Sequence, residues 1–185
     1  MKLAVIDFET EMVGDYGDLV PRPIEIGIVL IDGYKILAEQ EHWIYPDRPL
    51  LVRPPAHDLT GAQKAKVIEA EHWSNVHAQV INFVPPDYIP AAWSATFDRQ
   101  VWETACARYK CSTYVNHHWF CLMLATWAFL AAIDRPFDMA RNSLINAHDK
   151  MGIPFKHAHR ALQDARAEAN MFLLAKSSCL LEMKS

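Results

Sequence analysis

Two carboxylates at the end of an apolar segment are the side chains in this sequence best placed for metal chemistry. Residues 2–9 are almost entirely apolar until Asp7 and Glu9, which is typical of a buried strand whose charged end opens into a cleft. Successive strand side chains point to opposite faces, so Asp7 and Glu9 project together, about 6.6 Å apart along the strand. Phe8 points to the other face, where we expect the core. Two carboxylates on one edge are suited to holding hard divalent cations.

Three further candidates lie far along the chain. Asp98 ends the segment Ala-Thr-Phe-Asp at residues 95–98, and His159 precedes Asp164 in a His-x4-Asp pattern. Each has an ordinary structural explanation when taken singly. An Asp at a helix start is more often an N-cap than a ligand, and a His before a helix is usually a surface or capping residue. Their ordered combination with the two carboxylates at the chain start is what indicates chemistry.

The bulk composition is that of an ordinary globular protein. The chain has 185 residues, of which 51% are hydrophobic and 22% charged, so we expect one domain over residues 1–185. The net charge of −4 argues against a strong non-specific DNA binder, whose affinity would come from basic residues. Four candidate carboxylates account for that charge, and two divalent cations would cancel it locally. A nucleic-acid substrate therefore remains compatible with the composition.

The chain start and the apolar stretches predict no targeting or membrane segment. No basic region followed by an apolar stretch precedes the first strand. The longest apolar stretch, residues 120–133, is too short for a membrane span. We therefore expect a cytoplasmic protein with no membrane partner.

The cysteines are expected to be free thiols, because the sequence shows no secretory context. One group within a short stretch offers zinc-type ligands: Cys106, Cys111, His117, His118 and Cys121. It contains no CxxC pair, so buried small hydrophobic side chains are the favoured interpretation.

The first third of the chain predicts an antiparallel meander. After the first strand, residues 11–23 contain Gly and Pro and indicate a loop. Residues 24–31 are β-prone and end at Asp32-Gly33, which is a hairpin signal. Residues 34–45 would form the returning strand.

The remainder predicts mostly helices. We expect a Pro-rich extended connection at residues 46–55, a short buried strand at 88–93, and helices from Thr60 and over 73–83, 97–107, 119–133, 139–151 and 159–175. Gly152 is a suitable C-terminal cap. In the last helix Ala161, Ala165 and Ala169 form a smooth stripe for close packing, and Asp164 lies beside this stripe, where a cleft could begin.

The ordered set of acidic residues and histidine resembles the DEDDh family of 3′–5′ exonucleases, which includes polymerase proofreading subunits, ribonuclease T and exonuclease X. The residues that carry the likeness are Asp7, Glu9, Asp98, His159 and Asp164. The resemblance covers residues 6–174 and includes Glu-Ile-Gly at residues 25–27 and Ala-His-Asp-Leu-Thr-Gly at residues 56–61. It implies an α/β fold of the ribonuclease H-like type, with a mixed five-stranded sheet flanked by helices.

The resemblance also implies the chemistry. Asp7, Glu9, Asp98 and Asp164 would hold two Mg²⁺ or Mn²⁺ ions, and His159 would be the general base. Two such cations activate a water and stabilise the leaving oxygen of a phosphodiester, and an oxygen-rich cage suits them better than zinc. An ordinary histidine titrates near pH ~6.5 and accepts a proton near neutral pH.

Substrate contacts follow from the same resemblance. Thr10 and His57 would lie at the terminal nucleotide. Phe97 would either pack in the core, which we favour, or flank that nucleotide, and Arg160 is a candidate phosphate contact. Trp93-Ser94 stands where many relatives have His-Asn, which would change substrate positioning near Asp98.

We therefore expect a metal-dependent 3′–5′ exonuclease that acts on single-stranded 3′ ends of DNA or RNA and releases nucleoside 5′-monophosphates. Two alternatives stay open, namely a non-catalytic nucleic-acid-binding module and a proofreading subunit that associates with a polymerase. A homodimer also stays open.

Overall fold

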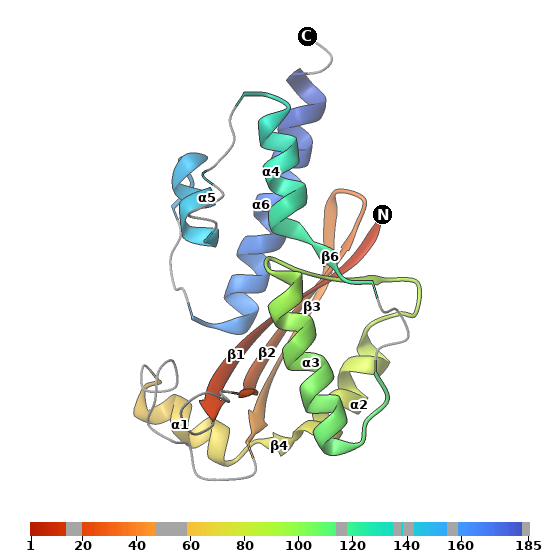
Figure 1. The fold of residues 1–185 in the computed structure, drawn as a ribbon, viewed down its shortest axis with the longest axis vertical. Coiled ribbons are helices and arrows are strands. Elements are labelled where there is room, and N and C mark those ends of the chain that lie inside the picture. The colour runs from red at the N-terminus through yellow and green to blue at the C-terminus, as the bar shows by residue number, and fades with distance from the viewer. Residues whose placement is uncertain are drawn as a thin grey trace.

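A six-stranded mixed sheet forms the centre of the fold (Figure 1). This computed structural model describes residues 1–13, 20–46, 59–113, 118–134, 138, 143–154 and 159–182. The strand order across the sheet is β4-β3-β2-β1-β5-β6. The expected α/β class with a mixed sheet between helices is confirmed.

The first three strands form the expected antiparallel meander. They are β1 (Lys2–Val13), β2 (Val20–Asp32) and β3 (Lys35–Tyr45). The turn between β2 and β3 contains Gly33 at φ +65°, a conformation that glycine adopts without steric cost.

The expected loop at residues 11–23 is wrong at both of its ends. Strand β1 continues to Val13, and β2 already begins at Val20. A register shift after Glu9 leaves one extra residue on β2, beyond which the ladder resumes with Thr10 opposite Pro23. Pro23 and Pro21 both lie in this outer part of the ladder, opposite Thr10 and Met12.

The sheet has one strand more than the five expected. Strand β5 (Ile89–Ala92) lies parallel to β1, as the short buried strand predicted near residues 88–93. Strands β4 (Glu71–His72) and β6 (Phe120–Cys121) are parallel additions beside β3 and β5. Both contain two residues, which is too short for a periodic pattern in the sequence.

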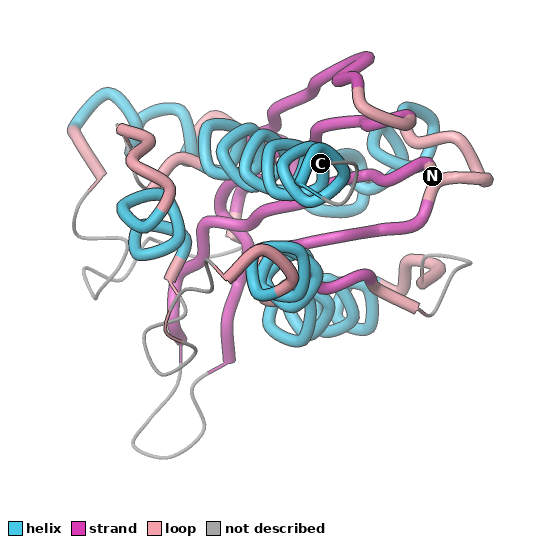
Figure 2. Tube along the Cα trace, turned by 90° about the horizontal axis from the view of Figure 1, so that it is seen from above, coloured by secondary structure: helices cyan, strands magenta, loops and turns pink. Residues whose placement is uncertain are grey.

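Helices cover both faces of the sheet (Figure 2). One face packs on α2 (Trp73–Phe83) and α3 (Ala95–Tyr109), and the other packs on α4 (Leu122–Ala131), α5 (Leu144–Lys150) and α6 (Ala161–Glu182). Every predicted helix is present where its residues are described. Helix α2 has the predicted bounds, residues 73–83, and the helix expected from Thr60 begins directly after that residue, whereas the helices after α2 have shifted ends. Residues 139–142 of the predicted fifth helix lie outside the described residues, and the final helix extends beyond the predicted end at residue 175.

Local signals fix two of these helix ends. Helix α1 (Gly61–Ile68) begins after Thr60, whose hydroxyl and backbone form a capping box with Gln63. Gly152 follows α5 at φ +67°, as expected for a C-terminal cap. The predicted connection at residues 46–55 lies outside the described residues after Pro46.

Helix α6 crosses the sheet at very close range. Its alanine stripe is fully buried, as predicted, and Ala161 opens the helix directly over Gly27 of β2. A Cβ on Gly27 would lie 2.2 Å from the backbone nitrogen of Leu162, so only glycine permits this approach. Gly27 pairs with Asp7 in the ladder, and the contact therefore sets the start of α6 beside Asp7.

None of the helices in the described part of the chain is long and apolar enough to cross a membrane.

Candidate functional site

Asp7 and Glu9 lie in the middle of β1, which continues beyond them to Val13, and both point to the α6 side of the sheet. Leu3 and Val5, which share the odd-numbered face with Asp7 and Glu9, pack in the cluster with α6. Phe8 points the other way and is 5% exposed, in the cluster with α2 and α3. The predicted alternation along β1 is confirmed.

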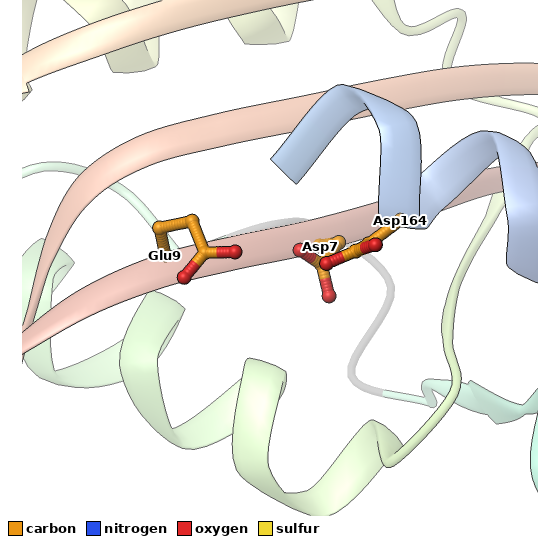
Figure 3. Close-up of side chains that lie close together, drawn as sticks. All are labelled: Asp7, Glu9 and Asp164. Carbon is orange, nitrogen blue, oxygen red and sulfur yellow. The ribbon is translucent and has the colours of Figure 1, made fainter. Parts of the chain in front are cut away.

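Asp164 joins these two carboxylates from the first turn of α6 (Figure 3). One carboxylate oxygen from each of Asp7, Glu9 and Asp164 lies within 4.8 Å of the other two. The Asp164 Oδ1 atom is buried and has no hydrogen-bond partner. An all-oxygen donor set with an unpaired buried acceptor fits a hard divalent cation. Residues far apart in the sequence therefore meet where the sequence predicted a metal site.

Asp98 reaches the same place from α3. It is 4% exposed, accepts a hydrogen bond from the backbone of Phe8, and lines one cavity together with Asp7 and Asp164. The N-cap of α3 is Ser94, so Asp98 is not the capping residue that the common structural explanation would make it. It lies outside the three-residue group but faces the same cavity.

His159 lies at the edge of this cavity, just before α6. It is exposed and adopts a left-handed backbone conformation at φ +72°, which is uncommon for a residue with a side chain. Its backbone N–H donates to Asp164 Oδ2 at 2.9 Å. The backbone thereby fixes the position of both residues of the His-x4-Asp pattern.

Arg160 is engaged by the protein itself. Its Nε donates to Glu25 Oε1 at 3.1 Å and its Nη2 donates to Glu41 Oε1 at 2.7 Å. The guanidinium also lies 5.1 Å from the centre of the Trp43 ring. These contacts anchor the start of α6 to β2 and β3, and a phosphate contact of Arg160 stays a prediction.

A fifth carboxylate, Glu168, belongs to the site and was missed by the sequence reasoning. It is 2% exposed, accepts a hydrogen bond from Trp93 N at 3.1 Å, and lines the same cavity as Asp7. The available signal was its spacing, because a residue four positions after Asp164 lies on the same helix face.

Burial and mutual repulsion raise the pKa values of these acids. The pKa of Asp7 lies well above its ordinary value, first because of burial and then because of the charges of Glu168 and Asp98. Burial raises the pKa of Glu9 to about 7, with the Asp164 charge adding to the effect. Burial also raises the pKa of Asp98 to about 7. A bound cation would offset both the desolvation and the repulsion.

The acids form the floor of a cavity of about 240 Å³ with an apolar wall. The wall includes Trp93, Phe97, Leu144 and Ile145. Phe97 is 40% exposed and Ile145 is 45% exposed. Phe97 is therefore a cavity residue, and the core position that we favoured for it is wrong. Exposed apolar side chains above an acidic floor offer a platform for a nucleobase.

Other sequence predictions have different outcomes. Thr10 is 5% exposed and lies opposite Pro23, just beyond the bulge in β2, and its contact with substrate stays a prediction. His57 lies outside the described residues, as does His117 of the zinc-type group. Cys106 is a buried free thiol whose pKa burial raises to about 12, in keeping with the favoured core role.

Sequence comparison matches this chain to known nucleolytic and polymerase sequences. The model of the exonuclease family RNase_T matches residues 4–172. The PolC-type DNA polymerase III of Thermotoga maritima is 29% identical over 170 residues. That alignment covers 91% of this chain but 11% of the polymerase, so the chain spans a small part of that protein's length.

Solved structures share the fold at low identity. The nuclease domain of 3'hExo, a DEDDh family member bound to rAMP, has a TM-score of 0.80 at 16% identity, covering 96% of this chain and 92% of that chain. Exonuclease X in complex with 5' overhanging duplex DNA has a TM-score of 0.64 at 22% identity, covering 95% and 92%. E. coli exonuclease I with a dT13 oligonucleotide has a TM-score of 0.77 at 18% identity, covering 99% and 42%.

Proposed function

This chain belongs to the RNase_T exonuclease family, and from that premise we propose that it is a metal-dependent 3′–5′ exonuclease. It would hydrolyse phosphodiester bonds at single-stranded 3′ ends of DNA or RNA and release nucleoside 5′-monophosphates. The observation that supports this most is the meeting of carboxylate oxygens of Asp7, Glu9 and Asp164 within 4.8 Å of one another. Asp7 and Asp164 also line a cavity together with Asp98 and His159.

Asp7, Glu9, Asp98 and Asp164 are the proposed ligands of two Mg²⁺ or Mn²⁺ ions. Such ions supply an activated water and stabilise the charge on the leaving oxygen of a phosphodiester. The four carboxylates provide the negative charge that attracts and orients them. The same charge repels a nucleic-acid backbone until it is neutralised, so substrate binding and catalysis should both depend on divalent cations.

His159 is the proposed general base. It is exposed at the rim of the cavity, so its imidazole can accept the proton of the attacking water and pass it to solvent. The hydrogen bond from its backbone to Asp164 keeps the base at a fixed distance from the acidic floor. Proton acceptance and cation binding are thereby placed in one loop-to-helix segment.

The apolar wall would hold the terminal nucleotide. Phe97 and Ile145 are the exposed members of the wall. Base stacking on an aromatic ring such as that of Phe97 tolerates any base, and Ile145 adds apolar contact. This arrangement favours progressive removal of nucleotides irrespective of sequence. We also propose that Thr10 and His57 contact the 3′ end of the substrate. Residues 1–185 are proposed to form one exonuclease domain.

The test uses single-stranded DNA and RNA labelled at the 5′ end or at the 3′ end, with Mg²⁺, Mn²⁺ or EDTA. We expect a ladder of shortened 5′-labelled products and immediate release of the 3′ label as a mononucleotide, both abolished by EDTA. Asp7→Ala should abolish the reaction. Glu103→Ala removes a carboxylate from an exposed pair with Arg99 on α3 and should leave it unchanged. Intact oligonucleotides with both metals would refute the proposal.

A second candidate function is proofreading in association with a polymerase. The likeness to the PolC-type polymerase favours it. A proofreading exonuclease should release a mispaired 3′ nucleotide from a duplex faster than a paired one, because only the former frays into a single strand. Equal rates on both duplexes would remove this candidate and leave the exonuclease proposal intact. A homodimer stays an open alternative.

A further inference from the structure

Four positions on the α6 face of the sheet form a cradle for the two residues that follow His159. On β2, Glu25 pairs with Trp43 of β3. Gly27, two residues further along β2, pairs with Glu41. Alternate residues of a strand share one face, and directly paired residues do so as well. The four positions therefore form one patch, which we call the α6 cradle (Glu25, Gly27, Glu41 and Trp43).

Arg160 occupies the cradle with its whole guanidinium group. Its Nε donates to Glu25 Oε1 at 3.1 Å, and its Nη2 donates to Glu41 Oε1 at 2.7 Å. The group also lies 5.1 Å from the centre of the Trp43 ring. The Glu25 side chain is fully buried and that of Arg160 is 23% exposed. A planar guanidinium with partners on two strands and a ring beside it is fixed in direction as well as in place.

The cradle also holds the backbone of the next residue. Ala161 lies directly over Gly27, so the side chain of Arg160 and the backbone of Ala161 are both fixed to the same patch. His159 precedes them at φ +72°, a conformation that a residue with a Cβ keeps only when the surrounding structure imposes it. The fixed pair of residues after His159 supplies this constraint, and the hydrogen bond from His159 N to Asp164 at 2.9 Å completes the turn.

We propose that Arg160 is a positioning residue, whose place in the α6 cradle holds the left-handed turn that presents the His159 imidazole to the cavity. The inference rests on the proposed function, because it takes His159 as the general base. Loss of the cradle contacts would let the turn relax and move the imidazole, while Asp7 and Asp98 stay on β1 and α3. A phosphate contact of Arg160 would act differently, because it would contribute to substrate binding.

The experiment compares two ion pairs that link α6 to β3, by steady-state kinetics on a 5′-labelled oligonucleotide with Mg²⁺. Arg160→Ala should lower kcat about 10²-fold with an unchanged KM. Glu41→Ala, which leaves the contact with Glu25 in place, should lower kcat to a smaller extent. The two changes alter the local charge in opposite directions, so a fall in both cannot come from charge alone. The matched controls are Arg166→Ala and Glu39→Ala, which break the second pair and should keep the wild-type kcat.

A second measurement needs neither metal nor nucleic acid. Hydrogen exchange of the His159 amide is followed by NMR of ¹⁵N-histidine-labelled protein in EDTA, with the signal assigned by its absence from His159→Gln. The exchange should be faster in Glu41→Ala than in the wild type, because the turn that holds this amide against Asp164 is loosened. Glu39→Ala should exchange as the wild type does. Equal acceleration in both variants would indicate general loosening of α6 and would overturn the inference.

The kinetic outcomes separate this inference from the proposed function. A wild-type kcat in Arg160→Ala would overturn the positioning role. A raised KM with an unchanged kcat would overturn it too, and would assign Arg160 to substrate binding instead. A wild type that hydrolyses no oligonucleotide would overturn the proposed function and the role of His159, while the exchange measurement still decides whether the cradle holds the turn. Circular dichroism checks folding, and Glu41→Ala carries the comparison should Arg160→Ala not fold.

Discussion

Replacing Gly27 with alanine tests whether one close approach between β2 and α6 builds the site. Gly27 pairs with Asp7, and a Cβ there would lie 2.2 Å from Leu162 N and 2.3 Å from the carbonyl carbon of Ala161. Real Cβ contacts essentially never fall below 3.0 Å, so helix or strand must shift by at least 0.8 Å. Both obstacles are backbone atoms, so a side-chain rotation cannot relieve the clash.

Two separate losses should follow from that shift. Forcing an extra carbon into a packed interface typically costs about 1–3 kcal/mol of stability. The displaced start of α6 also bears His159 and Asp164, and a misplacement near 1 Å in a catalytic group can reduce the rate about 10²-fold. We therefore expect Gly27→Ala to remain folded, with a reduced free energy of unfolding and a kcat lowered roughly 10²-fold.

The assay combines urea unfolding with kcat on a 5′-labelled oligonucleotide. Gly33→Ala is the matched control: Gly33 has φ +65°, so the change costs about 1 kcal/mol through backbone strain, but nothing lies within 4 Å of the added carbon. Its kcat should equal that of the wild type. If Gly27→Ala loses no more activity than Gly33→Ala at similar stability, the reasoning about the close approach is wrong.

Two other perturbations test the electrostatics around the site. Arg160→Ala leaves the fully buried Glu25 without its cation and should lower the free energy of unfolding, measured in urea, by about 3–5 kcal/mol. Arg166→Ala breaks a more exposed ion pair and should lower it by less than about 1 kcal/mol. Equal losses of stability in the two variants would contradict this prediction. Burial raises the pKa values of Glu9 and Asp98 to about 7. At any pH between the ordinary pKa of these carboxyl groups and about 7, the folded protein therefore binds more protons than the unfolded chain. Stability in EDTA is therefore present at low pH and falls as pH rises through about 7. Saturating Mg²⁺ should remove most of this fall in Tm, and a Tm in EDTA that is constant from about pH 5 to 8 would count against the buried acidic floor.

The sequence predicted those features that depend on local periodicity. Alternation along β1 placed Asp7 and Glu9 on one face and Phe8 on the other, because successive side chains of a strand point to opposite faces of the sheet. The alanine stripe predicted the buried face of α6 and the position of Asp164 at its edge. Capping residues predicted the start of α1 and the end of α5.

Features that depend on long-range pairing could not be predicted in this way. Glu168 has no local mark beyond its spacing from Asp164, and its hydrogen-bond partner Trp93 and its cavity neighbour Asp7 are set by the sheet order. Arg160 directly follows His159, yet its partners Glu25 and Glu41 lie on β2 and β3. The two-residue strands exist only because longer neighbours offer them open edges.

The late position of α6 along the chain has a consequence for biosynthesis. A ribosome makes β1 before α6, and Asp164 emerges only after the other proposed cation ligands. A truncated translation product that stops before α6 would have Asp7 and Glu9 on β1 but not the docked helix that brings Asp164 beside them. Unfinished chains should therefore be harmless to the messenger and ribosomal RNA around them, and nucleolytic competence should begin only when the last helix folds onto the sheet.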